Sequence, residues 1–143
     1  MLFKKLGDKK ISALCYGCGD ISKPNHVKYI KYAIKTGINY FDTSENYHNG
    51  KSETVLGIAI KNHRKKYIIS TKVAPENLKY DDVIKSCESS LKRLQTDYID
   101  IYYIHWPNSV IPIEETCSAL IYLTTQGKIL NIGICNFAYE QLI

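Results

Sequence analysis

No stretch of the sequence approaches the roughly 20 consecutive apolar residues that a membrane-spanning helix needs. The first residues, Met1 to Asp8, also lack an apolar segment followed by a small-residue cleavage site, which argues against a secretory signal. The five cysteines are scattered and odd in number, so a disulfide framework is not expected. These absences predict a cytoplasmic protein with no membrane partner.

Signals for nucleic-acid binding and for phosphate loops are also missing. The net charge of +5 comes from 19 basic and 14 acidic residues, and the densest basic run is Arg64-Lys65-Lys66. No aromatic or glycine-rich nucleic-acid motif accompanies that run, which we interpret as a solvated connection. Gly50-Lys51 lacks the other residues of a Walker motif. Nucleic acid is therefore not an expected partner.

One pair of cysteines has a spacing that also occurs in metal and redox sites. Cys15 and Cys18 form a Cys-x-x-Cys pair, which marks a redox pair or half of a zinc site in other contexts. No second pair follows it along the sequence. We therefore expect one strand residue and one loop residue, and no metal.

Hydrophobic periodicity predicts strands and helices in regular alternation. Asn25 is the expected N-cap of the first helix, and Gly37 is its expected C-terminal stop. The predicted strands cover residues 11–15, 38–41, 67–73, 98–104 and 131–135. The predicted helices cover residues 26–36, 52–63, 81–94 and 113–126.

This alternation calls for parallel strands joined by right-handed crossovers, which is an α/β fold. The repeat unit is about 30 residues, and a TIM-type (β/α)8 barrel typically needs roughly 250 residues. Residues 1–143 are thus predicted to form the first four to five βα units of such a barrel, as one incomplete domain. An open five-stranded sheet fits the same count, and periodicity alone does not separate the two.

Polar side chains follow four consecutive strands at the points where these strands end. They are Asp42 with Tyr47, then Lys72, then His105, and then the amide Asn136. Because the carboxyl ends of parallel strands share one edge, these side chains are expected to meet in one pocket. A phenol is a weak acid with an ordinary pKa of about 10. An ammonium about 4 Å away favours its ionised form, so the sequence predicts acid–base chemistry at this edge.

The motifs around these positions run through the whole chain. They are Gly37-Ile38-Asn39-Tyr40-Phe41-Asp42-Thr43-Ser44 with Tyr47, Glu53 and Leu56-Gly57; Ile69-Ser70-Thr71-Lys72; Tyr103-Ile104-His105-Trp106-Pro107; and Gly127-Lys128 with Ile132-Gly133-Ile134-Cys135-Asn136-Phe137. Together they resemble the aldo-keto reductases, which are (β/α)8 barrels that reduce carbonyl compounds with NADPH. The resemblance implies a small-molecule aldehyde or ketone as substrate and NADPH as cofactor.

The resemblance also implies a role for each strand-end residue. Tyr47 would be the general acid, Lys72 and Asp42 would tune it, and His105 would orient the carbonyl group. Asn136 would bind the nicotinamide carboxamide.

Two neighbouring residues complete the implied site. Cys135 stands where the family commonly has serine and would line the cofactor site, and Trp106 would line the substrate pocket. Each of three residues also has a simpler alternative role on sequence grounds. Asp42 suits a turn or a helix cap, Asn136 suits an N-cap, and Trp106 suits a cap on the core.

Part of the family's cofactor site has no counterpart in this sequence. In the family, the loop after the seventh strand and the start of the eighth helix hold the pyrophosphate and the adenosine 2′-phosphate, and those positions would lie beyond residue 143. The resemblance then implies a second polypeptide, or a second copy of the chain, that completes the barrel. The alternative is a non-catalytic interaction subunit, as in the family's potassium-channel β subunits, or an inactive remnant.

Overall fold

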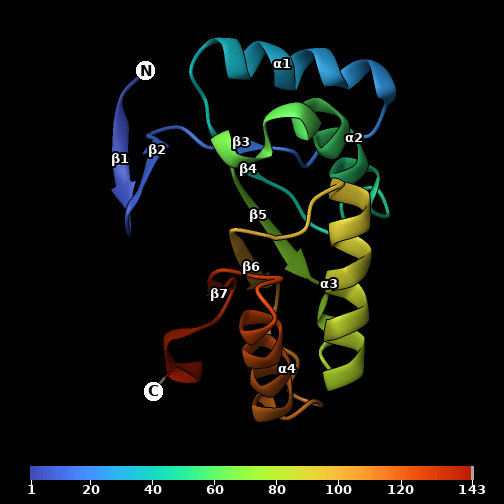
Figure 1. Cartoon of the computed structure of the whole chain (residues 1–143). Helices are drawn as coiled ribbons and strands as arrows, with labels where there is room; N and C mark the ends of the chain where they lie inside the picture. Colours follow the sequence, from blue (N-terminus) through green and yellow to red (C-terminus); the bar gives the residue numbers. More distant parts are fainter. Residues whose placement is uncertain (143) are drawn as a thin grey trace.

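Five parallel strands form one continuous sheet in the computed structural model, which describes residues 1–142 (Figure 1). In spatial order, which is also chain order, the strands are β3 (Tyr16–Gly17), β4 (Tyr40–Asp42), β5 (Ile68–Val73), β6 (Ile101–Ile104) and β7 (Ile132–Ile134). The connecting helices are α1 (Val27–Lys35), α2 (Lys51–Ile60), α3 (Tyr80–Leu94) and α4 (Ile113–Thr125). The short 3-10 turns are η1 (Pro24–His26), η2 (Lys61–Lys66), η3 (Pro75–Asn77) and η4 (Tyr139–Gln141). The predicted α/β fold with parallel strands is therefore confirmed.

The predicted first strand at residues 11–15 is wrong. Residues Lys9–Ser12 form β2, which pairs antiparallel with β1 (Phe3–Leu6) in a hairpin. Gly7 turns this hairpin at a φ of +56°, a value that glycine adopts without steric cost. The first parallel strand is Tyr16–Gly17, in the stretch expected to be a loop, and it pairs with Phe41 and Asp42. A two-residue strand is too short to produce a periodic signal.

The helices lie close to their predicted positions, but their starts differ. Gly37 ends α1 at a φ of +96°, as expected of a C-terminal stop. Asn25 is not the N-cap, because it lies inside η1 and the capping position falls to His26, with no side-chain hydrogen bond. Similarly, α2 begins at Lys51, one residue earlier than predicted.

The core lies between the sheet and the layer of helices that runs along one side of it in Figure 1. All six residues of β5 are buried, as expected for a central parallel strand. Helices α2 and α3 approach closely at Gly57, where an added Cβ would lie 2.7 Å from the Arg93 carbonyl oxygen. The core side chains with no exposed surface include Phe41, Leu56, Ile69, Leu94, Tyr102 and Leu120.

The sheet is open within the described residues, since β3 and β7 each have one neighbour. The hairpin of β1 and β2 lies against the amino ends of the parallel strands, where the Lys10 carbonyl accepts a hydrogen bond from the Asn39 amide at 2.9 Å. The opposite, carboxyl ends are left clear of the hairpin. Among the described helices, none is long and apolar enough to cross a bilayer.

Candidate active site

The sheet brings the predicted strand-end residues to one edge. Asp42 is the last residue of β4 and lies beside Ser70 of β5, while Lys72 lies two residues further along β5. His105 directly follows β6, and Asn136 comes two residues after β7. Since all these strands are parallel and adjacent, the carboxyl edge of the sheet collects their side chains.

The centre of this edge is an ion pair between Asp42 and Lys72. The Lys72 ammonium donates to Asp42 Oδ2 at 2.6 Å and to the Thr43 carbonyl oxygen at 2.7 Å. Ser70 donates to the other carboxylate oxygen at 2.6 Å. Lys72 is only 6% exposed, and an ammonium is buried at acceptable cost only when it is paired in this way.

Tyr47 lies over this ion pair. The Lys72 Nζ atom is 5.1 Å from the centroid of the half-buried Tyr47 ring, which places the cation at the face of the phenol. The backbone after Tyr47 is strained, because His48, Asn49 and Gly50 have consecutive φ values of +52°, +54° and +78°. Such left-handed residues often accumulate at functional sites, and here they turn the chain sharply into α2.

His105 packs against the other side of this group. Its ring meets the Tyr47 ring edge to face, with centroids 5.9 Å apart and planes at 84°. Its Nδ1 atom lies 3.2 Å from the Ser44 hydroxyl oxygen. Burial, and then the positive charge of Lys72, lower the pKa of His105 below 6.5, which keeps the imidazole neutral near pH 7.

Asn136 is tied to His105 through the backbone. Its amide Nδ2 donates to the His105 carbonyl oxygen at 2.8 Å and lies 3.2 Å from the Cys135 sulfur. Asn136 has a φ of +61° and does not cap η4, whose capping position is Ala138, so the N-cap alternative is wrong.

The two other simple alternatives are also contradicted. Asp42 caps no helix, since its carboxylate is occupied by Lys72 and Ser70. Trp106 is 51% exposed and therefore does not cap the core, and its ring centroid lies 6.5 Å from that of His105.

The basic run lies away from this edge group, whereas Cys18 directly follows β3 and its backbone N–H donates to the Asp42 carbonyl oxygen at 2.8 Å. Cys18 is fully buried, and burial raises the pKa of its thiol, whereas Cys15 is exposed. The interpretation of residues 64–66 as a solvated connection is wrong for Arg64. Its guanidinium donates to Asp100 at 2.7 Å and to the Tyr98 carbonyl at 2.9 Å, because it closes the amino end of the sheet.

Sequence reasoning missed several residues that hold the site together. Ser70 and the Thr43 carbonyl fix the ion pair, and Ser44 contacts the imidazole. Glu45 accepts hydrogen bonds from the Ala74 backbone N–H at 2.7 Å and from Asn77, which joins the loop after β4 to the loop after β5. The signal that was available was the run of polar residues directly after each strand.

The fold and these strand-end residues place the chain among known proteins. The sequence model described as "Aldo/keto reductase family" matches residues 6–143. The chain therefore belongs to the aldo-keto reductase family.

Curated relatives agree with this assignment. The aldo-keto reductase YhdN of Bacillus subtilis (strain 168) is 38% identical over 134 residues, which cover 87% of this chain and 40% of that protein. The methylglyoxal reductase YeaE of Escherichia coli (strain K12) is 38% identical over 120 residues, which cover 84% of this chain and 42% of that protein. A probable voltage-gated potassium channel subunit beta of Arabidopsis thaliana is 31% identical over 159 aligned positions, which cover 99% of this chain and 48% of that protein. The chain thus spans less than half of the length of each of these relatives.

Solved structures show the same fold. The thermostable aldo-keto reductase Tm1743, crystallised with the inhibitor epalrestat, matches with a TM-score of 0.92 at 44% identity, over 99% of this chain and 56% of that one. An aldo/keto reductase from Klebsiella pneumoniae, solved with NADP and acetate, matches with a TM-score of 0.89 at 33% identity, over 93% and 48%.

Proposed function

We propose that residues 1–143 form the N-terminal half of an NADPH-dependent carbonyl reductase, in which Tyr47 donates a proton to the carbonyl oxygen. The observation that carries this proposal is the buried Lys72 ammonium, paired with Asp42 at 2.6 Å and placed 5.1 Å from the Tyr47 ring centroid. The reductases among the relatives support the reaction class. The methylglyoxal reductase among them suggests small, reactive aldehydes as the substrate class.

Proton transfer leaves a negative charge on the Tyr47 oxygen. The Lys72 ammonium stabilises this charge, and fixed charges that face a developing charge lower the barrier because they need no reorganisation. Asp42 and the Thr43 carbonyl hold the ammonium in its position. We therefore assign Lys72 and Asp42 to tuning the acid.

The neutral His105 imidazole orients the carbonyl group. When the Ser44 hydroxyl donates to Nδ1, the ring carries its proton on Nε2, where it can donate to a carbonyl oxygen. Trp106 is half exposed beside this ring and would supply an apolar wall for the substrate.

Residues at the end of β7 fit the nicotinamide end of NADPH. Asn136 is exposed, and its Oδ1 atom has no hydrogen-bond partner within residues 1–142, so it can accept a bond from the carboxamide. Cys135, half-buried beside it, would line the same site. When bound, NADPH supplies the hydride that reduces the carbonyl carbon. We place the sites for the pyrophosphate and the 2′-phosphate on polypeptide outside these 143 residues.

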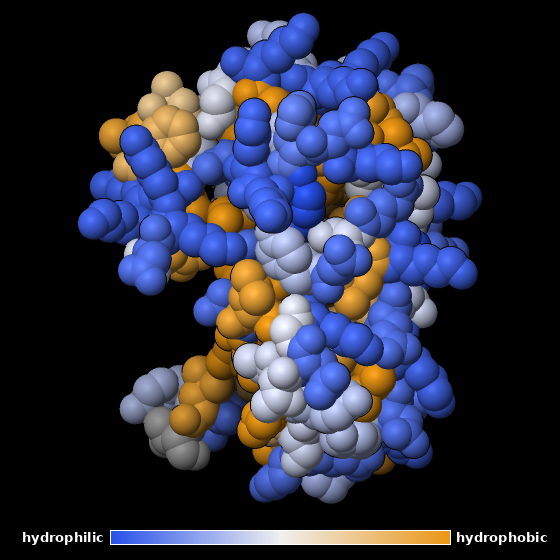
Figure 2. Space-filling model, viewed as in Figure 1, coloured by the Kyte–Doolittle hydropathy of each residue, from blue (hydrophilic) through white to orange (hydrophobic). Residues whose placement is uncertain are grey.

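Further polypeptide would also complete the barrel. Ile132 and Ile134 of β7 are 45% and 44% exposed. Figure 2 shows apolar residues along the hollow between the N-terminal hairpin and the C-terminal segment. An edge strand with exposed apolar side chains favours pairing with another strand. We assign that role to a second polypeptide or to a second copy of the chain, and a stable, cooperatively melting monomer of residues 1–143 in size-exclusion chromatography would contradict it.

NADPH binding and turnover test the main proposal. The purified protein is titrated with NADPH while nicotinamide fluorescence is recorded, and then methylglyoxal is added while NADPH oxidation is followed. We expect a fluorescence change and aldehyde-dependent oxidation once the barrel is complete. Absence of both signals in the completed protein would overturn the proposal.

The second candidate function is a non-catalytic interaction subunit. It is favoured by the Arabidopsis thaliana channel subunit, whose match covers 99% of this chain. NADPH binding without turnover of any aldehyde would favour this second function.

A further inference from the structure

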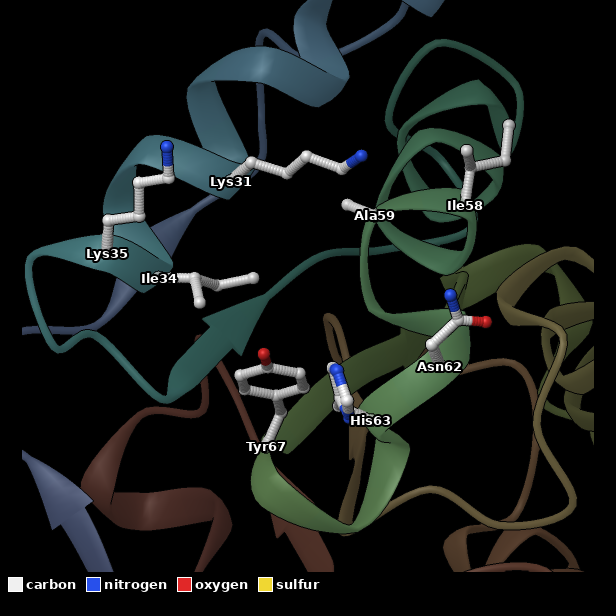
Figure 3. Close-up of a pocket in the computed structure, with 8 residues that line it drawn as sticks. All are labelled: Lys31, Ile34, Lys35, Ile58, Ala59, Asn62, His63 and Tyr67. Carbon is white, nitrogen blue, oxygen red and sulfur yellow. The ribbon is translucent and has the colours of Figure 1, made fainter.

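A pocket on the helical side of the molecule is not explained by the proposed reductase site. It has a volume of about 330 Å³ and lies between α1, α2 and the turn η2 (Figure 3). Tyr67, at its base, precedes β5, and Lys72 is five residues further along that strand. At about 3.3 Å per strand residue, the pocket is roughly 16 Å from the Asp42–Lys72 ion pair. The two regions can therefore be tested separately.

The pocket has an apolar base and a polar rim. Ile34 and Ala59 line it together with the Tyr67 ring, and in Figure 3 the Ile34 side chain points toward that ring. The polar lining residues are Lys31, Lys35, Asn62 and His63. No acidic residue lines the pocket, so an anion there meets no neighbouring carboxylate among its walls.

Tyr67 adds a ring and a hydrogen-bond donor to this pocket. The residue is only 8% exposed, and its ring packs edge to face against buried Phe41, with centroids 5.7 Å apart. Its hydroxyl points into the pocket, forms no hydrogen bond within residues 1–142 and is not a buried atom, so a ligand can reach it (Figure 3). Burial raises the pKa of this hydroxyl, which therefore stays protonated and serves as a donor. A hydroxyl without a protein partner can donate a hydrogen bond to an acceptor that enters the pocket.

Two lysines supply positive charge to the pocket lining. Lys31 and Lys35 lie one turn apart on α1, a helix with no acidic residue in its sequence, and Lys31 extends toward Ala59 across the pocket in Figure 3. His63 interrupts the helical conformation of η2, with φ −143° and ψ 32°, and its ring lies beside that of Tyr67. Neither lysine forms an ion pair within residues 1–142.

The wider charge distribution favours the same kind of ligand. Residues 1–72 carry 14 Lys and Arg and 5 Asp and Glu, whereas residues 73–143 carry 5 and 9. A region with such an excess of positive charge attracts anions from solution.

We propose that this pocket binds a small amphiphilic anion, a carboxylate or phosphate joined to a short apolar group. The apolar group would rest on Ile34, Ala59 and the Tyr67 ring, and the anionic head would face Lys31, Lys35 and the Tyr67 hydroxyl. A volume of about 330 Å³ is at the lower end of the range of roughly 300–1,000 Å³ for ligand sites, which favours a small molecule.

Calorimetric titration tests the ligand class. Octanoate and octyl phosphate are the probes, with acetate, octanol and octylammonium as matched compounds that lack the apolar group, the charge or the correct sign. We expect one molecule of octanoate or octyl phosphate per chain, bound at least tenfold more tightly than the other three. The comparison of octanoate with octyl phosphate identifies the preferred head group. Equal binding of octanol would overturn the proposal, and so would binding only to anionic phospholipid vesicles.

Two variants test the location. Tyr67→Phe removes only the hydroxyl and is expected to weaken octanoate binding about tenfold, as for loss of a hydrogen bond to a charged group. The double variant Lys31→Met, Lys35→Met is expected to weaken it by more. Tyr32 and Lys28 lie on the same helix but outside the pocket, so the control variants Tyr32→Phe and Lys28→Met should leave binding unchanged. Unchanged binding in folded Tyr67→Phe and in the double lysine variant would place the ligand elsewhere and overturn the proposal.

Discussion

Asp42 and Asp100 each hold a cation against the sheet, Asp42 at the carboxyl ends of the strands and Asp100 at the amino ends. Asp100 is 1% exposed and accepts hydrogen bonds from Arg64 at 2.7 Å, from the Ile69 backbone N–H at 3.0 Å and from Lys9. Both carboxylate oxygens accept hydrogen bonds and the side chain is buried, so this group closes one end of the sheet.

The ion pair at the other end is more open. The Asp42 side chain is 28% exposed, and the Lys72 ammonium that it binds also faces the ring of Tyr47. Similar buried ion pairs thus differ in what surrounds them. The Asp100 carboxylate is buried and meets only cations and a backbone N–H, so this group contributes to stability alone. The Asp42–Lys72 pair stays open to a phenol and an imidazole, so it can also serve a reaction.

The largest expected effect is on activity, at Tyr47. In the completed reductase, Tyr47→Phe removes the proposed proton donor, and kcat should fall by roughly 10²–10⁴-fold, the usual contribution of general acid catalysis. The free energy of unfolding should change little, because no hydrogen bond joins the Tyr47 hydroxyl to residues 1–142. Steady-state kinetics and urea unfolding measure the two quantities, with exposed Tyr32→Phe as the control. A kcat within twofold of the parent would refute the assigned role.

The next effect is on stability, at Asp100. Asp100→Asn leaves the buried Arg64 without its countercharge, and breaking a buried pair in this way costs about 3–5 kcal/mol of unfolding free energy. Urea unfolding measures the loss, and the ratio of kcat to KM of the folded fraction should stay unchanged. A loss below about 1 kcal/mol would show that this end of the sheet does not depend on the ion pair.

A smaller effect concerns pH and His105. Its folded-state pKa is lowered, first by burial and then by Lys72, whereas the unfolded chain titrates near 6.5. The unfolded state therefore takes up the proton first as pH falls. The stabilising contribution is complete above about pH 6.5 and is lost as pH falls through that value toward the folded-state pKa.

Histidine changes its charge between about pH 5 and pH 8, so unfolding free energies measured over this range follow the contribution of His105. NMR titration of the imidazole gives its pKa directly. His105→Gln should flatten the dependence in this range. An NMR pKa above 6.5 for the parent protein would contradict the prediction.

The smallest effect is expected at a surface pair that resembles neither end of the sheet. Asp82 and Lys85 on α3 lie 3.6 Å apart and are 42% and 73% exposed. Asp82→Asn should lower the unfolding free energy by about 0.2–1 kcal/mol, and added salt should reduce the difference. A loss as large as that at Asp100 would remove the distinction between buried and exposed pairs.

Much of the candidate site was predictable, because polar residues that directly follow a buried strand must lie at the edge of the sheet where that strand ends. Asp42, Lys72 and His105 were identified in this way, and the structure gathers them with Tyr47. Ser44 and Ser70 were not identified, because a serine after or within a strand is common and its partner is set by the neighbouring strand. Arg64 was misassigned for a related reason: in the sequence it belongs to a basic run, and its carboxylate partner is 36 residues away.

The sequence by itself determined the alternation of helices and strands from β4 onward, the chemistry at the strand ends and the family resemblance, because periodicity and turn residues act over a few positions. Three features depended on the tertiary structure. The N-terminal hairpin at the amino ends, the saturation of Asp100 and the pocket around Tyr67 all arise from contacts between residues far apart in the chain. Hydrogen bonding and burial depend on which strands and helices become neighbours, and no local pattern encodes that.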